Sequence, residues 1–190
     1  MNRRSVLKAS IGSMAAFSAA GSASRDNPVV RENSKPGTAE WQLQFTRFDN
    51  PITQASYPLN RQIRSSAIEG YASRTSVLAG DSIDFMVGMS PAGKFVMDFY
   101  RMGYYGGTGG RHMLRLGPFK AEPQPIPMMT VERLRECAWT KSASLSVPKD
   151  WPSGVYLGKL TRDEPFGLQS YVVFVVKEHR PVDLLFQVAA

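Results

Sequence analysis

The segment whose residue types are best suited to binding or catalysis runs from Tyr100 to Arg111, where five of the eight residues from 103 to 110 are glycine. Glycine lets the backbone adopt positive φ and approach a partner closely. The flanking arginines offer planar, fork-like hydrogen-bond donors, and the paired tyrosines offer flat amphipathic rings. The pattern predicts a binding or domain-docking loop whose candidate residues are Arg101, Tyr104, Tyr105, Gly106, Gly107 and Arg111.

This loop lacks the features of two well-known phosphate sites. No Gly-Lys-Ser/Thr follows it, and no strand–loop–helix pattern surrounds it, which excludes a phosphate-binding P-loop and a dinucleotide fingerprint. A second interpretation stays open, in which the loop is a long bulged turn between two strands and its tyrosines belong to the core.

No catalytic residue, metal site or cofactor is predicted in the chain. It has two histidines, His112 and His179, and neither has a metal-ligating partner at the usual spacing. The single cysteine, Cys137, excludes an intrachain disulfide, and beside Trp139 we expect it to be a small buried hydrophobic group rather than a nucleophile. A general acid at Glu69 would need a partner that the sequence does not identify.

Residues 1–23 are predicted to be a signal peptide of the twin-arginine type. Arg3 and Arg4 begin it, and after Lys8 no charge occurs until Arg25, across a mildly apolar run rich in Ala, Ser and Gly. That run is too short and too polar for a membrane span, which needs ~20 predominantly apolar residues. We therefore expect export to the periplasm or the extracellular space, and no stable membrane span.

The charge balance does not require a nucleic-acid partner. The formal net charge is +7, and residues 1–23 carry three of these positive charges and no acid. The remainder would carry about +4, and no basic stripe interleaved with aromatic residues occurs in it.

The rest of the chain predicts an all-β fold. Residues 24–62 are expected to form an irregular lead-in, because frequent prolines break both helices and central strands. From residue 63 the hydrophobic period becomes two, as in Ile83, Phe85 and Val87. Short strands separated by turns predict an antiparallel immunoglobulin-like or fibronectin-like β-sandwich over residues 63–179.

Three finer predictions concern individual strands. The runs 82–90 and 95–100 are separated by Ser90-Pro91-Ala92-Gly93, so we expect them to pair as a hairpin. The run 171–176 is apolar at every position, so we expect it to be covered on both faces. A further apolar run, 182–188, follows Pro181, and we interpret residues 180–190 as the start of a truncated following domain.

Four segments, in the same order, resemble the family of the large (β) subunit of N,N-dimethylformamidase, in its amino-terminal region. The resemblance covers roughly residues 33–190. The segments are Ile68-Glu69-Gly70-Tyr71-Ala72-Ser73 with Ala79-Gly80-Asp81, the loop at 100–107, residues 147–156, and residues 180–187.

The resemblance implies a β-rich amino-terminal region followed by a glutamine-amidotransferase-like α/β domain. The founding enzyme hydrolyses dimethylformamide to dimethylamine and formate, using an iron held by two tyrosines and a glutamate of that later domain. No iron ligand is therefore assigned here, and the implied function is a non-catalytic domain whose partner is the missing carboxy-terminal α/β domain. Two alternatives stay open: a stand-alone exported module that binds carbohydrate or cell-envelope material through Tyr104, Tyr105 and Trp151, and amide hydrolysis by the chain itself. The oligomeric state is not predicted.

Overall fold

The computed structural model describes residues 27–47 and 65–180. The predicted signal peptide at 1–23 and the apolar run at 182–188 lie outside these residues. The described part contains one α-helix, eight strands and a short 3-10 turn: α1 Pro28–Asn33, β1 Glu69–Ala72, β2 Ser76–Leu78, β3 Ser82–Gly88, β4 Gly93–Met102, η1 Tyr105–Gly107, β5 Gly110–Ala121, β6 Ala143–Ser146, β7 Gly154–Arg162 and β8 Gln169–Lys177.

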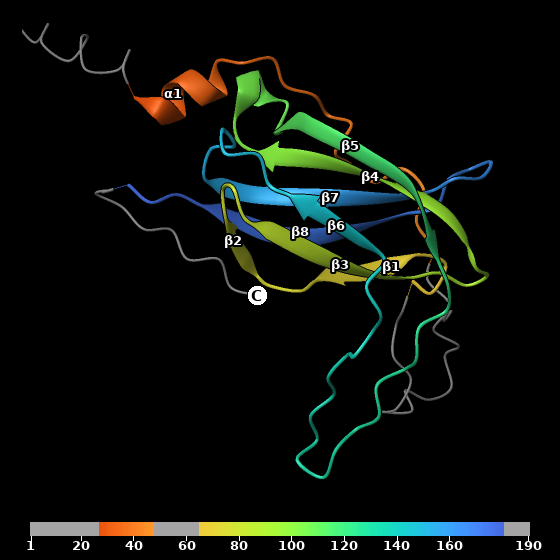
Figure 1. Ribbon diagram of the computed structural model, residues 1–190. Helices are drawn as coiled ribbons and strands as arrows, with labels where there is room; N and C mark the ends of the chain where they lie inside the picture. The colour runs from red at the N-terminus through yellow and green to blue at the C-terminus, as the bar shows by residue number, and fades with distance from the viewer. Residues whose placement is uncertain (1–26, 48–64, 181–190) are drawn as a thin grey trace, which may run out of the picture.

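The fold is a β-sandwich, as the strand pattern predicted (Figure 1). Within the described residues, one sheet has three strands in the order β1-β3-β6, and the other has five in the order β2-β8-β7-β4-β5. The strand pairs are antiparallel except β2 and β8, which run parallel over three residues, from Ser76 opposite Val175 to Leu78 opposite Lys177.

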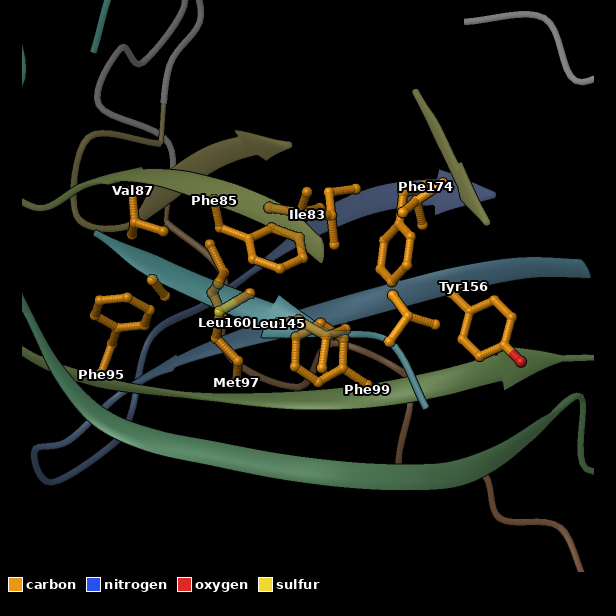
Figure 2. Close-up of a cluster of buried hydrophobic side chains, with 14 of the residues drawn as sticks. Ile83, Phe85, Val87, Phe95, Met97, Phe99, Leu145, Tyr156, Leu160 and Phe174 are labelled. Atoms are coloured by element: carbon orange, nitrogen blue, oxygen red, sulfur yellow. The ribbon is translucent and has the colours of Figure 1, made fainter. Parts of the chain in front are cut away.

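The core lies between the two sheets and is built from the inward-facing side chains that the period of two identified. β3 contributes Ile83, Phe85 and Val87, and β4 contributes Phe95, Met97 and Phe99, all of them almost fully buried. Figure 2 shows Phe85, Phe99 and Phe174 converging from different strands, and the rings of Phe85 and Phe99 lie 5.5 Å apart. Burial of each such side chain contributes about 1.5–3 kcal/mol, so this layer provides much of the stability that positions the loops.

The predicted hairpin between 82–90 and 95–100 is wrong. β3 pairs with β1 and β6, whereas β4 pairs with β5 and β7, so residues 89–92 connect one sheet to the other. The turn residues were identified correctly, but alternation shows which face of a strand is buried and not which strand lies beside it. Facing strands of a sandwich have the same alternation as paired strands of one sheet.

The expectation that 171–176 is covered on both faces is also wrong. Val172 and Phe174 are buried in the core, but Val173, on the outer face of β8, is 50% exposed. Part of that outer face is covered by the lead-in, since the Tyr171 hydroxyl donates to the backbone carbonyl of Trp41.

The lead-in is not wholly irregular, because residues 28–33 form α1. Asn27 caps this helix by accepting a hydrogen bond from Val29 N at 2.8 Å, and Pro28 occupies its first turn. Proline is tolerated there, since the first turn has no intrahelical use for that N–H. Beyond α1, Lys159 Nζ on β7 donates to the carbonyls of Glu40 and Gln42 at 2.7 and 3.0 Å, which fixes the lead-in across the outer face of the five-stranded sheet.

Candidate functional site

The glycine-rich loop connects β4 to β5 at the end of the sandwich where α1 lies (Figure 1). The backbone takes positive φ at three glycines of the loop, with values of 67° at Gly106, 93° at Gly107 and 86° at Gly109. Tyr105, which directly precedes Gly106, has a φ of 40°. An added Cβ would meet nothing within 4 Å at Gly106 or Gly107. These glycines therefore serve the tight backbone turn.

Arg101 is the last inward-facing side chain of β4, and it is buried. Its Nη1 donates to the Tyr105 hydroxyl at 2.8 Å, while Nη2 and Nε donate to the carbonyl of Ser153 at 2.8 and 3.3 Å. Ser153 N in turn donates to Glu178 Oε1 at 2.6 Å. The guanidinium thus joins the loop to the start of β7 and to the residues that follow β8.

Tyr105 lies at the centre of the site and is 2% exposed. Its hydroxyl accepts from Arg101 and donates to Glu32 Oε1 at 2.9 Å. Burial raises the pKa of Tyr105, so this hydroxyl remains protonated and able to donate. The tyrosine therefore links the arginine of the strand to a carboxylate of α1.

Glu32 is 4% exposed, and its carboxylate lies close to two cationic side chains. Lys35 Nζ lies 2.7 Å from its Oε2, and Arg111 Nε lies 2.8 Å from its Oε1. Burial alone would raise the pKa of Glu32, but the hydrogen bonds from Lys35 and Tyr105 and the charge of Arg111 outweigh it and hold the pKa below its usual value of 4.5. The carboxylate is consequently ionised at neutral pH.

Arg111 Nε is buried and, among the described residues, makes no hydrogen bond. Its 2.8 Å distance to Glu32 Oε1 satisfies the requirement for an ion pair, but the orientation does not satisfy that for a hydrogen bond. The arginine therefore contributes mainly charge to the site in this arrangement.

The loop backbone also holds the lead-in. Asn33 Oδ1 accepts from Tyr104 N at 2.6 Å and from Tyr105 N at 3.4 Å. Farther along, Thr38 N donates to Gly110 O at 2.7 Å and Trp41 Nε1 donates to Thr108 O at 2.9 Å. The glycine-rich loop is thus a docking loop for the chain's own lead-in.

The predicted loop residues divide into two groups. Arg101, Tyr105 and Arg111 are brought together, whereas the Tyr104 side chain is 71% exposed and takes no part in the site. Sequence reasoning missed Glu32 and Asn33, because they lie far from the loop in the chain. An indication was available in the two arginines, since a strand-borne arginine that faces inward needs an acidic partner.

The expectation about Cys137 is corrected, and His112 has a partner in the structure. Cys137 is exposed rather than buried, and its carbonyl accepts from the Tyr71 hydroxyl at 3.0 Å. His112 Nε2 lies 3.0 Å from Oδ1 of Asp98, a partner on the neighbouring strand that sequence spacing did not identify. In the described ranges, no group of three or more His, Cys, Asp or Glu residues could hold a metal ion.

A second feature is the long connection between β5 and β6, which we call the arm and define as residues 123–142. It extends away from the sandwich at the bottom of Figure 1. Its base is fixed where Trp139 N donates to the Tyr71 hydroxyl at 3.1 Å and Trp139 Nε1 donates to Pro125 O at 2.8 Å. Its outer part exposes the apolar side chains of Ile126, Met128, Met129, Val131 and Leu134.

None of the helices in the described part of the chain has the length and apolar character that crossing a bilayer requires.

Comparison with curated proteins gives no match. Residues 96–190, half of the chain, match the protein family described as N,N-dimethylformamidase beta subunit-like, C-terminal. That description refers to a C-terminal part of those proteins, so the amino-terminal placement inferred from the sequence remains a prediction. Because this match covers half of the sequence, the chain belongs to the N,N-dimethylformamidase beta subunit-like, C-terminal family.

Proposed function

We propose that the chain is a non-catalytic β-sandwich domain of an exported N,N-dimethylformamidase-like protein, whose amide hydrolysis takes place in an α/β domain that follows it. One observation carries the non-catalytic role. Tyr105 and Arg111, two of the polar groups best suited to chemistry, contact Glu32 of the same chain, and Arg101 donates to the Tyr105 hydroxyl, so the chain's own side chains occupy these groups. The family of the chain supports the larger context.

The iron implied by the family resemblance does not fit these residues. Tyr105 and Glu32 do come together, but Arg111 and Lys35 both lie within 2.8 Å of the carboxylate. Two cationic side chains at that distance repel a metal cation, and they already neutralise the charge of the carboxylate. We therefore derive no chemical step through iron in this chain.

The binding-module alternative gains no support from the aromatic residues. A carbohydrate platform requires flat rings on one exposed face, and of the three candidates Tyr105 and Trp151 are buried, leaving Tyr104 exposed. The Trp151 ring stacks on Tyr156 with centroids 4.8 Å apart, which places it in the core.

Assays of the isolated chain test the catalytic part of this proposal. The 190-residue protein should release no dimethylamine from dimethylformamide above the buffer rate, with or without added ferrous iron. Turnover that survives repurification and scales with protein concentration would refute the non-catalytic role. An α/β domain from the same reading frame, produced separately, should bind the chain with 1:1 stoichiometry in analytical ultracentrifugation.

Export needs its own test, because it rests on residues 1–23 alone. A reporter that the twin-arginine route exports only when folded should reach the periplasm when fused to these residues. Changing both Arg3 and Arg4 to lysine should abolish that transport. A reporter that remains in the cytoplasm behind the unaltered segment would contradict export.

A further inference from the structure

The geometry points to a carboxylate-binding site formed by Arg101, Tyr105 and Arg111, in which Glu32 of the lead-in is the resident ligand and which an external carboxylate occupies when α1 moves away. This inference goes beyond the proposed function and does not depend on it. It concerns what the pocket recognises, whether or not the chain has a catalytic neighbour.

The pocket has the donors that a carboxylate requires. The Tyr105 hydroxyl donates to Glu32 Oε1 at 2.9 Å, and it is oriented by Arg101 Nη1 at 2.8 Å from its other side. Arg111 adds a positive charge 2.8 Å from the same oxygen. Charge-assisted contacts of this kind are about twice as strong as neutral ones, and guanidinium groups match planar anions.

Arg101, which orients the Tyr105 hydroxyl, is fixed by the sandwich and not by Glu32. It leaves the end of β4 and is held by the carbonyl of Ser153, at 2.8 Å from Nη2 and 3.3 Å from Nε. The backbone of Arg111 stands in β5, opposite Arg101 in the strand register. Removal of Glu32 would thus leave the Arg101–Tyr105 pair in place and the Arg111 guanidinium without its anion. A buried donor set that has lost its acceptor is costly, and this favours uptake of a replacement.

Arg111 Nε also has capacity that Glu32 does not use. It is buried and lies 2.8 Å from Glu32 Oε1, in an orientation that forms no hydrogen bond. A carboxylate that is not tethered to α1 can turn to accept from Tyr105 and from Arg111 together. Once Glu32 is displaced or removed, a free ligand can therefore form a hydrogen bond that the tethered one does not.

The resident ligand sits on an element that is weakly stabilised by itself. α1 has six residues, well below the ~12–15 that an isolated helix needs in water. Val29 and Val30 on it are exposed, whereas Glu32 and Asn33 in its last turn contact the body. The lead-in is anchored again at Gly37, which packs closely against Thr108, and at Thr38, so the proposal places the hinge of α1 at residues 34–36.

The test is chemical rescue of a variant that lacks the resident carboxylate. Glu32→Ala should unfold at a lower temperature than the unaltered chain, and sodium acetate should restore part of the loss in a saturable manner. At ten times its dissociation constant, acetate should stabilise the variant by about 1.4 kcal/mol and raise the melting temperature by about 3–6 °C. Neither sodium chloride at equal ionic strength nor acetamide at equal concentration should raise the melting temperature in this way.

Two controls assign the effect to the pocket. Acetate should stabilise the unaltered chain no more than chloride does, because Glu32 occupies the site. It should also fail to stabilise the double variant Glu32→Ala/Arg111→Met, which lacks one of the guanidinium groups. Equal responses of the single variant to acetate, chloride and acetamide would overturn the proposal.

A second variant covers the case in which Glu32→Ala does not fold in either salt. Asn33→Ala keeps the carboxylate but removes the acceptor at 2.6 Å from Tyr104 N, which loosens α1. Acetate should then stabilise Asn33→Ala more than it stabilises the unaltered chain, and an identical response of the two proteins would reject the site.

A final experiment distinguishes the two sources of a carboxylate. A peptide of residues 27–35, which carries Glu32 together with Asn33, is titrated into Glu32→Ala in parallel with acetate. Tighter binding of the peptide supports the site with a glutamate of a polypeptide as its ligand. Comparable binding supports the site with a small free carboxylate as its ligand, and binding of neither refutes it.

Discussion

Removal of the Tyr105 hydroxyl should weaken the whole α1 end of the sandwich. The ring is 2% exposed, and its hydroxyl accepts from Arg101 Nη1 at 2.8 Å and donates to Glu32 Oε1 at 2.9 Å. Tyr105→Phe keeps the ring and removes both bonds. Each involves a charged partner, for which a hydrogen bond contributes about 1.5–3 kcal/mol, so the two together predict a loss of about 3–6 kcal/mol of unfolding free energy.

The chain offers a matched control in the adjacent residue. The side chain of Tyr104 is 71% exposed, so Tyr104→Phe should change the unfolding free energy by less than about 0.5 kcal/mol. Urea titrations followed by circular dichroism give both values. With a slope of ~2 kcal/mol per molar urea, the urea midpoint of Tyr105→Phe should fall by about 1.5–3 M. Coincident midpoints for the two variants would refute a bridging role for the buried hydroxyl.

Three further predictions test the docking of the lead-in. The difference in unfolding free energy between the unaltered chain and Glu32→Gln should be constant above about pH 5 and shrink as the pH falls below 4.5. The pKa of Glu32 is lowered in the folded protein, so protonation of the carboxylate removes its contribution to stability. Acid titrations of both proteins measure this difference, and a pH-independent value would contradict the prediction. Gly37→Ala should lower the unfolding free energy by about 1–3 kcal/mol, because its Cβ would lie 2.1 Å from Thr108 Oγ1. The Cβ of Gly106→Ala would meet open space, so this variant should lose only ~1 kcal/mol, because of its φ of 67°. Lys159→Met should raise the rate of amide hydrogen exchange in the lead-in at least about tenfold, and Lys177→Met, at an exposed position of β8, should not.

The strand faces could be predicted from the sequence because their cause is local. Ile83, Phe85 and Val87 alternate with less apolar residues, and one face of β3 is buried in the structure accordingly. The pairing of β3 with β1 and β6 could not be predicted, because it depends on which elements meet across the core. Alternation is identical for a hairpin partner and for a strand of the opposite sheet.

The candidate site shows the same division. Glycine, arginine and tyrosine types predicted a binding or domain-docking loop from a short stretch of sequence. In the structure this loop holds the chain's own lead-in, and docking to another domain stays a prediction. The docked segment itself was misjudged, because Pro28 was taken as a helix breaker although it lies in the first turn of α1. Glu32 could not be assigned, since nothing local indicates that its carboxylate would be buried against residues about 70 positions later in the chain.

The strand order of the five-stranded sheet has a consequence for the time at which the protein can fold. β2, at residues 76–78, is an edge strand whose only neighbour in the described sheet is β8, at residues 169–177. A ribosome that has synthesised the first hundred residues has therefore made a strand with no available neighbour. Because contacts so distant in sequence form slowly, the nascent chain must be kept from aggregating until β8 has been synthesised.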